Sequence, residues 1–212
     1  MYALVTDGSI AKTFSGNRGL TIGDIQYPRD IFSKWTEAQR NAIGIFEVIQ
    51  NNAKKKDEAY YTNTNQTFTY DADAGTVTAT YGDATAKAHA DTKWTQKQID
   101  DGEAPAGADT DTVAVEGLKT IRIRTVKAQA AGILQDTDWY VVRKADAGTA
   151  VPSAITTYRA AVRTKCAEME TAITNASNTP AIETLYTYVN TADEGDPVVM
   201  ERPLGEFPVL GS

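Results

Sequence analysis

Two residues of this sequence are the only ones of their type and suit acid–base or nucleophilic chemistry: His89, its single histidine, and Cys166, its single cysteine. A catalytic or metal-bound imidazole needs partners, and these residues form no HExxH, CxxC or Cys–His arrangement. We interpret His89 as an exposed or locally hydrogen-bonded histidine. Cys166 falls on the apolar stripe of an expected helix, where a free cysteine usually acts as a small buried hydrophobe.

Acidic and glycine-rich segments offer no stronger chemistry. Residues 71–75 read DADAG, like the start of a calcium loop, but no bidentate glutamate follows at EF-hand spacing. Gly16, Gly19 and Gly23 match neither a phosphate-binding loop nor a dinucleotide fingerprint. The sequence therefore predicts no catalytic residue, no cofactor and no metal. A pair of carboxylates that converge only in the fold, as in a glycan hydrolase, stays as a remote alternative.

Aromatic and arginine side chains between residues 137 and 163 are candidates for recognition rather than reaction. The residues to which we assign a partner-binding role are Trp139, Tyr140, Tyr158, Arg159 and Arg163. Each has a plainer alternative. The two aromatic neighbours at 139 and 140 are more often core residues. The two arginines lie one helical turn apart, where they are either solvated or matched by acidic neighbours.

Two helices must position these side chains. Residues 118–133 are mostly good helix formers, although residues 121–126 also alternate like a strand. Residues 152–176 begin with Pro152 in the first turn of the expected helix. Their apolar residues recur every three or four positions and draw one stripe: Ile155, Tyr158, Val162, Cys166, Met169 and Ile173. We expect an antiparallel hairpin whose bend lies at residues 137–139, with Trp139 and Tyr140 closing the space between the helices.

The N-terminal part reads as a small β-rich domain. Strands are expected at residues 2–5, 20–26 and 45–49, and a β-hairpin pairs residues 60–70 with 76–81 around the turn at 71–75. Thr36 is the N-cap of one short helix, with Gln39 completing a capping box and Gly44 ending the helix.

These segments predict an α+β fold. We expect a β-rich N-terminal domain over residues 1–97 and an acidic linker over 98–112, because that stretch is rich in Gly, Ala and Pro. The antiparallel helical hairpin domain then covers residues 113–192 and includes a shorter helix at 181–188. An extended C-terminal tail, residues 193–212, is able to lie along a surface.

Composition limits the partners. The chain of 212 residues has 42% hydrophobic residues, a net charge of −7 and a pI near 4.8. A folded protein fits these values, whereas nucleic acid is not expected as a partner because phosphate binding needs a surplus of Lys and Arg. No segment approaches the ~18 consecutive apolar residues of a membrane span. No secretory signal is visible, so we expect a protein made in a cytoplasm.

The ordered set Ile133-Leu134, Thr137-Asp138-Trp139, Tyr158-Arg159 and Val162-Arg163 resembles the C-terminal region of tail assembly chaperones and tail-fibre assembly proteins of tailed bacteriophages. Members of that family carry a Leu-rich helix, a Thr-Asp-Trp element and a helix that opens around Tyr-Arg-x-x-Leu-Arg. The resemblance covers residues 127–172. This chain departs from the pattern in a longer connection after Trp139, and it lacks the Trp-Pro-type ending of many members.

The resemblance implies a non-enzymatic phage tail protein that binds a tail-fibre or other tail component, for assembly or for attachment. It would act in the host cytoplasm during assembly or stay in the virion tail. The helical stripe would serve a partner helix or self-association into a homo-oligomer. The alternative is a permanent structural component of the virion, such as a fibre adaptor or a baseplate-peripheral protein.

Overall fold

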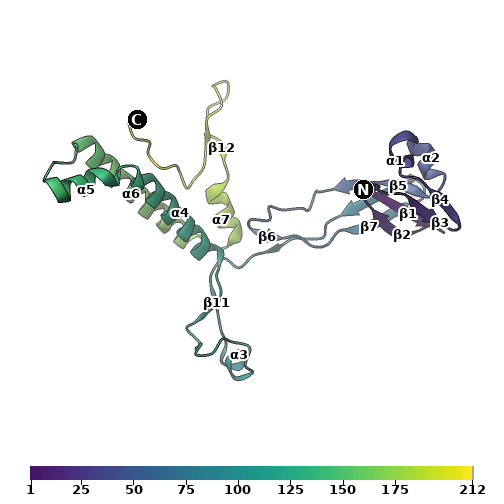
Figure 1. Ribbon diagram of the computed structural model, residues 1–212, viewed down its shortest axis with the longest axis horizontal. Helices are drawn as coiled ribbons and strands as arrows, with labels where there is room; N and C mark the ends of the chain where they lie inside the picture. The colour runs from purple at the N-terminus through teal and green to yellow at the C-terminus, as the bar shows by residue number, and fades with distance from the viewer. Residues whose placement is uncertain (212) are drawn as a thin grey trace. The chain divides into compact units, whose positions relative to one another are not determined.

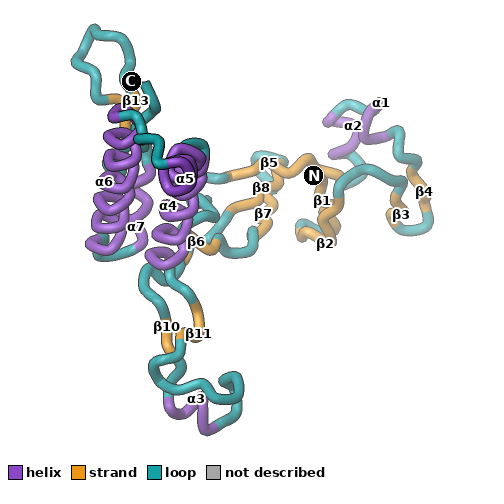
Figure 2. The backbone as a smooth tube through the Cα atoms, turned by 60° about the vertical axis from the view of Figure 1, so that its left-hand side comes forward, coloured by secondary structure: helices purple, strands orange, loops and turns teal. Residues whose placement is uncertain are grey.

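The computed structural model describes residues 1–211 and divides into two compact units, Met1–Thr85 and Ala86–Ser212. The first unit is rich in strands and the second in helices, so the predicted α+β class is confirmed (Figures 1 and 2). Within residues 1–211, no helix combines the length and the apolar character that crossing a membrane requires.

A five-stranded sheet forms the first unit. In spatial order its strands are β2 (Ser9–Phe14), β1 (Tyr2–Thr6), β5 (Ile45–Asn51), β8 (Thr76–Thr80) and β7 (Thr67–Asp71). Neighbours run antiparallel except β5 and β8, which are parallel. The expected strands at 2–5 and 45–49 and the turn at 71–75 are confirmed. The expected strand at 60–70 is wrong in extent, because only β6 (Tyr61–Thr62) and β7 are extended.

The neighbouring internal strands β1 and β5 bury side chains on both faces of this sheet. Ala3 pairs with Phe46 and lies in one apolar cluster, whereas the next pair, Leu4 and Ile45, lies in another. Ile31, only 1% exposed, joins the second cluster from a short helix. Since successive strand residues point to opposite faces, the adjacent buried residues of each strand, Ala3-Leu4 and Ile45-Phe46, serve the two clusters on opposite sides of the sheet.

Two of the small elements differ from prediction. Residues 20–27 form a hairpin of β3 (Leu20–Ile22) and β4 (Ile25–Tyr27), because Gly23 adopts a positive φ of 56° and turns the chain. The unit has two short helices instead of one, α1 (Ile31–Lys34) and α2 (Glu37–Asn41). The capping box that we predict at the start of α2, between Thr36 and Gln39, is confirmed.

The second unit is built on two long antiparallel helices. They are α4 (Leu118–Gln135) and α6 (Ser153–Asn175), linked through α5 (Asp138–Ala147). Contacts join the start of each helix to the end of the other. Lys119 Nζ lies 2.7 Å from the Thr174 carbonyl oxygen, and a guanidinium nitrogen of Arg159 lies 2.8 Å from the Leu134 carbonyl oxygen. The hairpin is therefore present as predicted, but its connection is a helix.

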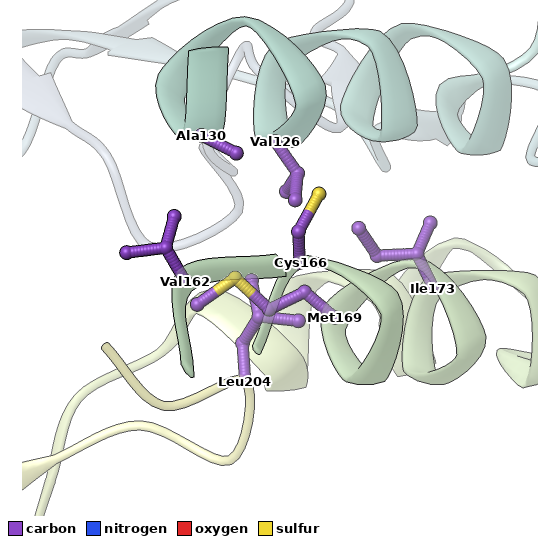
Figure 3. Packing of buried hydrophobic residues seen from close by; sticks show 7 residues of the cluster. All are labelled: Val126, Ala130, Val162, Cys166, Met169, Ile173 and Leu204. Carbon is purple, nitrogen blue, oxygen red and sulfur yellow. The ribbon is translucent and has the colours of Figure 1, made fainter. Parts of the chain in front are cut away.

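Four residues of the predicted stripe form the core between these helices: Val162, Cys166, Met169 and Ile173. Val126 and Ala130 of α4 and Leu204 of the C-terminal segment, which were not predicted, complete it (Figure 3). The residues of α6 lie three or four positions apart, so one face of the helix stays against α4 throughout its length.

The C-terminal segment is not the separate extended tail that we expect from sequence. Helix α7 (Thr179–Tyr186) has Asn178 as its N-cap, and the side-chain oxygen of Asn178 accepts a hydrogen bond from the Ala181 N–H at 2.9 Å. Strand β12 (Val189–Asn190) then pairs with β13 (Met200–Glu201), across the predicted domain boundary at 192. Leu204 beyond them is 3% exposed, because an apolar side chain there completes the core of α4 and α6.

The predicted linker is also misplaced. The division between the units falls at Thr85, and residues 98–112 lie inside the second unit. They contain the end of α3 (Gln96–Asp100) and lead to β11 (Val113–Val115). Strand β11 pairs with β10 (Thr92–Lys93), and together these elements form an arm that leads into α4 (Figure 1). None of the described residues 86–116 is buried, which is why this stretch has the composition of a linker.

Candidate partner-binding surface

Arg159 fixes the bend between α4 and α5. It projects from α6 and is 8% exposed. One terminal nitrogen donates to the Leu134 carbonyl oxygen at 2.8 Å and to the Thr137 hydroxyl at 2.6 Å. The other lies 2.8 Å from the Asp138 carboxylate. A planar guanidinium can serve three acceptors at once, so this side chain ties the end of α4, the bend and the start of α5 to α6.

Trp139 does not close the space between the helices, and that prediction is wrong. Its side chain is 51% exposed on the first turn of α5. The indole contacts Tyr140, with ring centroids 4.0 Å apart, and the Arg143 guanidinium, 4.6 Å from its ring centre. The buried guanidinium of Arg159 takes the place in the bend that the sequence suggests for the indole, because it satisfies backbone carbonyl and hydroxyl groups that an indole could not.

Helix α5 exposes side chains suited to binding a partner and contributes no buried residue to a hydrophobic core. All ten of its residues, 138–147, are described, and none is buried. Trp139, Val142 and Arg143 lie three and four positions apart on one side of the helix. With the half-buried Tyr140 they form what we call the α5 surface. Trp, Tyr and Arg are the residue types that most often carry the binding free energy of protein interfaces.

The remaining predicted residues divide between structure and surface. Tyr158 is half-buried and packs against the core cluster of the helices. The Arg159 guanidinium is buried and bound to the bend, so its side chain has a structural role in this fold. The binding roles that sequence assigns to Tyr158 and Arg159 stay predictions. Arg163 is exposed and donates a weak hydrogen bond of 3.4 Å to the Arg159 carbonyl oxygen. An acidic neighbour of the kind that sequence allows for this arginine pair is present. It is Asp138, which forms an ion pair with Arg159.

Sequence reasoning missed Val142 and Arg143 because it treats residues 140–144 as a connection. Two adjacent β-branched valines, Val141 and Val142, weaken the helical signal of this segment. A signal was nevertheless present. Gly148 takes a left-handed φ of 69° and ends α5 as a C-terminal glycine, and Asp138 supplies an acidic first turn.

The titratable groups with shifted pKa values have structural partners. The Gly117 backbone N–H, at 2.7 Å, and then the Thr120 hydroxyl lower the pKa of the Asp91 carboxyl. That carboxylate ties the residue before α4 to its first turn, while the Leu118 and Lys119 backbone N–H groups donate to the Ala88 and His89 carbonyl oxygens. Burial, followed by a contact with Glu170, raises the pKa of the Cys166 thiol, so the thiolate is disfavoured at neutral pH.

The hollows among the described residues differ in their ionisable lining, and one of about 400 Å³ in the second unit is lined by Lys165, Glu168 and Glu206. A hollow of about 920 Å³ beside residues 12–21 has Lys12 and Arg18 as its ionisable lining, without a carboxylate or imidazole. Across residues 1–211, no group of three or more His, Cys, Asp or Glu side chains could hold a metal ion.

The chain exposes more surface than two compact domains of its size. Its accessible area is 13,611 Å². Two separate compact domains with the lengths of these units would expose about 11,500 Å² together, so about 2,000 Å² is surplus. Any contact between the units could only lower the measured area, which makes the comparison independent of their placement. Segments without buried residues, α5 among them, account for such a surplus.

Comparisons of this chain with protein-family models, with curated proteins and with solved structures find no match.

Proposed function

We propose that this chain is a non-enzymatic tail protein of a tailed bacteriophage that binds a tail-fibre or other tail component, either to assist its assembly or to attach it. The observation that supports binding is the α5 surface, a helix with no buried residue among 138–147 that presents an indole, a phenol ring and a guanidinium together. The link to phage tails comes from the ordered motifs of residues 127–172.

The physical basis of the proposal is an aromatic anchor held in place before binding. Trp139 is stacked on Tyr140 and Arg143, so its ring has fewer orientations to lose when a partner covers it. The Arg159 contacts hold the whole helix at its N-terminal end. A partner with an apolar pocket and a carboxylate beside it would match the indole and the guanidinium.

The test is co-expression of this chain with the tail-fibre protein encoded in the same genome, followed by co-purification. Trp139→Ala should weaken association at least tenfold, since a central aromatic anchor contributes about 2 kcal/mol or more. Its free energy of unfolding should fall by only about 1 kcal/mol, because the ring is half exposed and its contacts with Tyr140 and Arg143 lie at the surface. Ile49→Ala is the matched control, since Ile49 is 53% exposed in the first unit and lies outside the α5 surface.

If the wild-type chain neither co-purifies with the fibre protein nor changes its solubility, the proposal is wrong. Mass spectrometry of purified particles then separates the two roles. A chaperone is absent or substoichiometric, whereas a permanent adaptor or baseplate-peripheral component is present at a multiple of three or six copies.

A further inference from the structure

The β12–β13 ribbon (Tyr188–Glu201) is a second surface with no core of its own. None of the described residues 187–203 is buried. Its large apolar side chains, all between 46% and 70% exposed, are Tyr188, Val189, Val198, Val199 and Met200. A two-stranded ribbon is marginal in water unless a further strand or another surface covers it.

The order of these apolar residues indicates how the ribbon is covered. Val198 and Val199 directly precede β13, and with Met200 they form a run of three consecutive apolar residues, whose side chains would point to both sides of an extended segment. Continuous apolar runs are typical of strands that are covered on both faces, whereas a strand with one wet face alternates. Both strands are also edge strands, because β12 and β13 pair only with each other in the described chain. An added strand would therefore find free backbone groups and apolar side chains together.

The base of the ribbon is held firmly. The Arg202 guanidinium lies over the rings of Tyr186 and Tyr188, with 5.7 and 5.4 Å to their centres. It also pairs with the Glu206 carboxylate at 2.7 Å, which in turn accepts a hydrogen bond from the Tyr188 hydroxyl. The ribbon thus leaves the helical core in a fixed direction, and its cation is already engaged.

The negative charge of the ribbon indicates which kind of partner strand can bind it. Among residues 1–211, the carboxylates of Asp193, Glu194, Asp196 and Glu201 take part in no ion pair. A second copy of the ribbon would add like charge with no free cation to offset it. We infer that the β12–β13 ribbon binds a protein partner by strand addition, and that the partner offers an apolar sheet edge flanked by Lys or Arg. This inference rests on the proposed function only for the source of that partner, a tail component.

The inference is tested with two synthetic strand peptides and the full-length, isotope-labelled chain. One peptide alternates valine with lysine and threonine, and the other has glutamate in place of lysine. The basic peptide should bind, shift the amide resonances of residues 198–201 and protect them from exchange. Val199→Asp should weaken this binding about tenfold or more, because the new carboxylate would replace an apolar contact with the valines of the added strand and lose its water there. Val115→Asp is the matched control, since Val115 is 60% exposed on the other ribbon, at β11.

A charge-reversal variant keeps the test independent of folding defects at Val199. Replacement of Asp193, Glu194 and Asp196 by lysine should weaken the basic peptide about tenfold at low salt and reverse the preference toward the acidic peptide. Absence of binding, equal binding of both peptides, or protection outside the ribbon would overturn the inference. So would a wild-type dimer in sedimentation that Val199→Asp dissociates, because the occupant would then be a second copy.

The same variants separate this inference from the proposed function. A Val199→Asp chain that still co-purifies with the fibre protein at wild-type yield leaves the proposed function standing and removes the ribbon from it. A wild-type chain that binds the basic peptide through the ribbon, but no tail protein, retains the ribbon chemistry and removes the function.

Discussion

Removal of the Arg159 side chain should destabilise the helical unit much more than removal of a neighbouring arginine. Arg159→Ala loses two charge-assisted hydrogen bonds, to Leu134 and Thr137, and one ion pair to Asp138. The carboxylate partner is 54% exposed and is rehydrated in the variant, so that pair adds at most about 1 kcal/mol. The Leu134 oxygen keeps its bond from the Thr137 hydroxyl at 2.9 Å, which limits the penalty there.

Together with the lost packing of the buried side-chain stem, these contributions give about 3 kcal/mol. For a unit of this length, that corresponds to a melting temperature lower by roughly 10 °C. The measurement is urea and thermal unfolding followed by far-ultraviolet circular dichroism, which reports mainly the helices. Arg163→Ala is the matched control on the same helix and should stay within about 0.5 kcal/mol of wild type. Equal stability of the two variants would refute the assignment of Arg159 as the residue that fixes the bend.

Two further predictions concern groups with shifted pKa values. The pKa of Asp91 is lowered in the folded chain, so its contribution to stability is complete above its unfolded pKa near 4 and is lost as pH falls through the folded pKa. Asp91→Asn should be less stable than wild type at pH 7 by at most about 1 kcal/mol, because the carboxylate is exposed and screened by water. A difference in unfolding free energy that fails to shrink toward pH 3 would contradict this. Cys166 should resist alkylation by iodoacetamide at pH 8 until the chain is unfolded, because burial raises the pKa of its thiol; labelling at the same rate with and without denaturant would show that the thiol is not in the core.

The elements that sequence predicted well are those whose signal is local. Thr36 and Gln39 are three residues apart, and their capping box depends on nothing else in the chain. The stripe of α6 is likewise periodic over its full length, so Val162 and Ile173, both fully buried, could be assigned to a core. Local consistency of this kind does not require knowledge of the partner element.

The features that sequence could not supply depend on pairing between distant segments. Nothing near Val48 or Val77 indicates that β5 and β8 are parallel neighbours, since the intervening residues include another strand. Leu204 reaches the helical core although it stands among prolines and exposed residues. The most consequential case is Arg159, which reads as a surface cation and is buried because three acceptors from the α4–α5 bend converge on it.

The buried Arg159 affects both the stability of the fold and the α5 surface, whereas the exposed Trp139 affects mainly the surface. A ten-residue helix with no buried side chain is too short to be stable in isolation, so α5 depends on the contacts at its start for its position. Loss of Arg159 would therefore disturb the α5 surface as well as the fold. Loss of Trp139 would remove the anchor of that surface while the bend keeps its guanidinium, hydroxyl and carbonyl contacts. A protein arranged in this way can vary the residues that meet its partner without altering those that hold the helix in place.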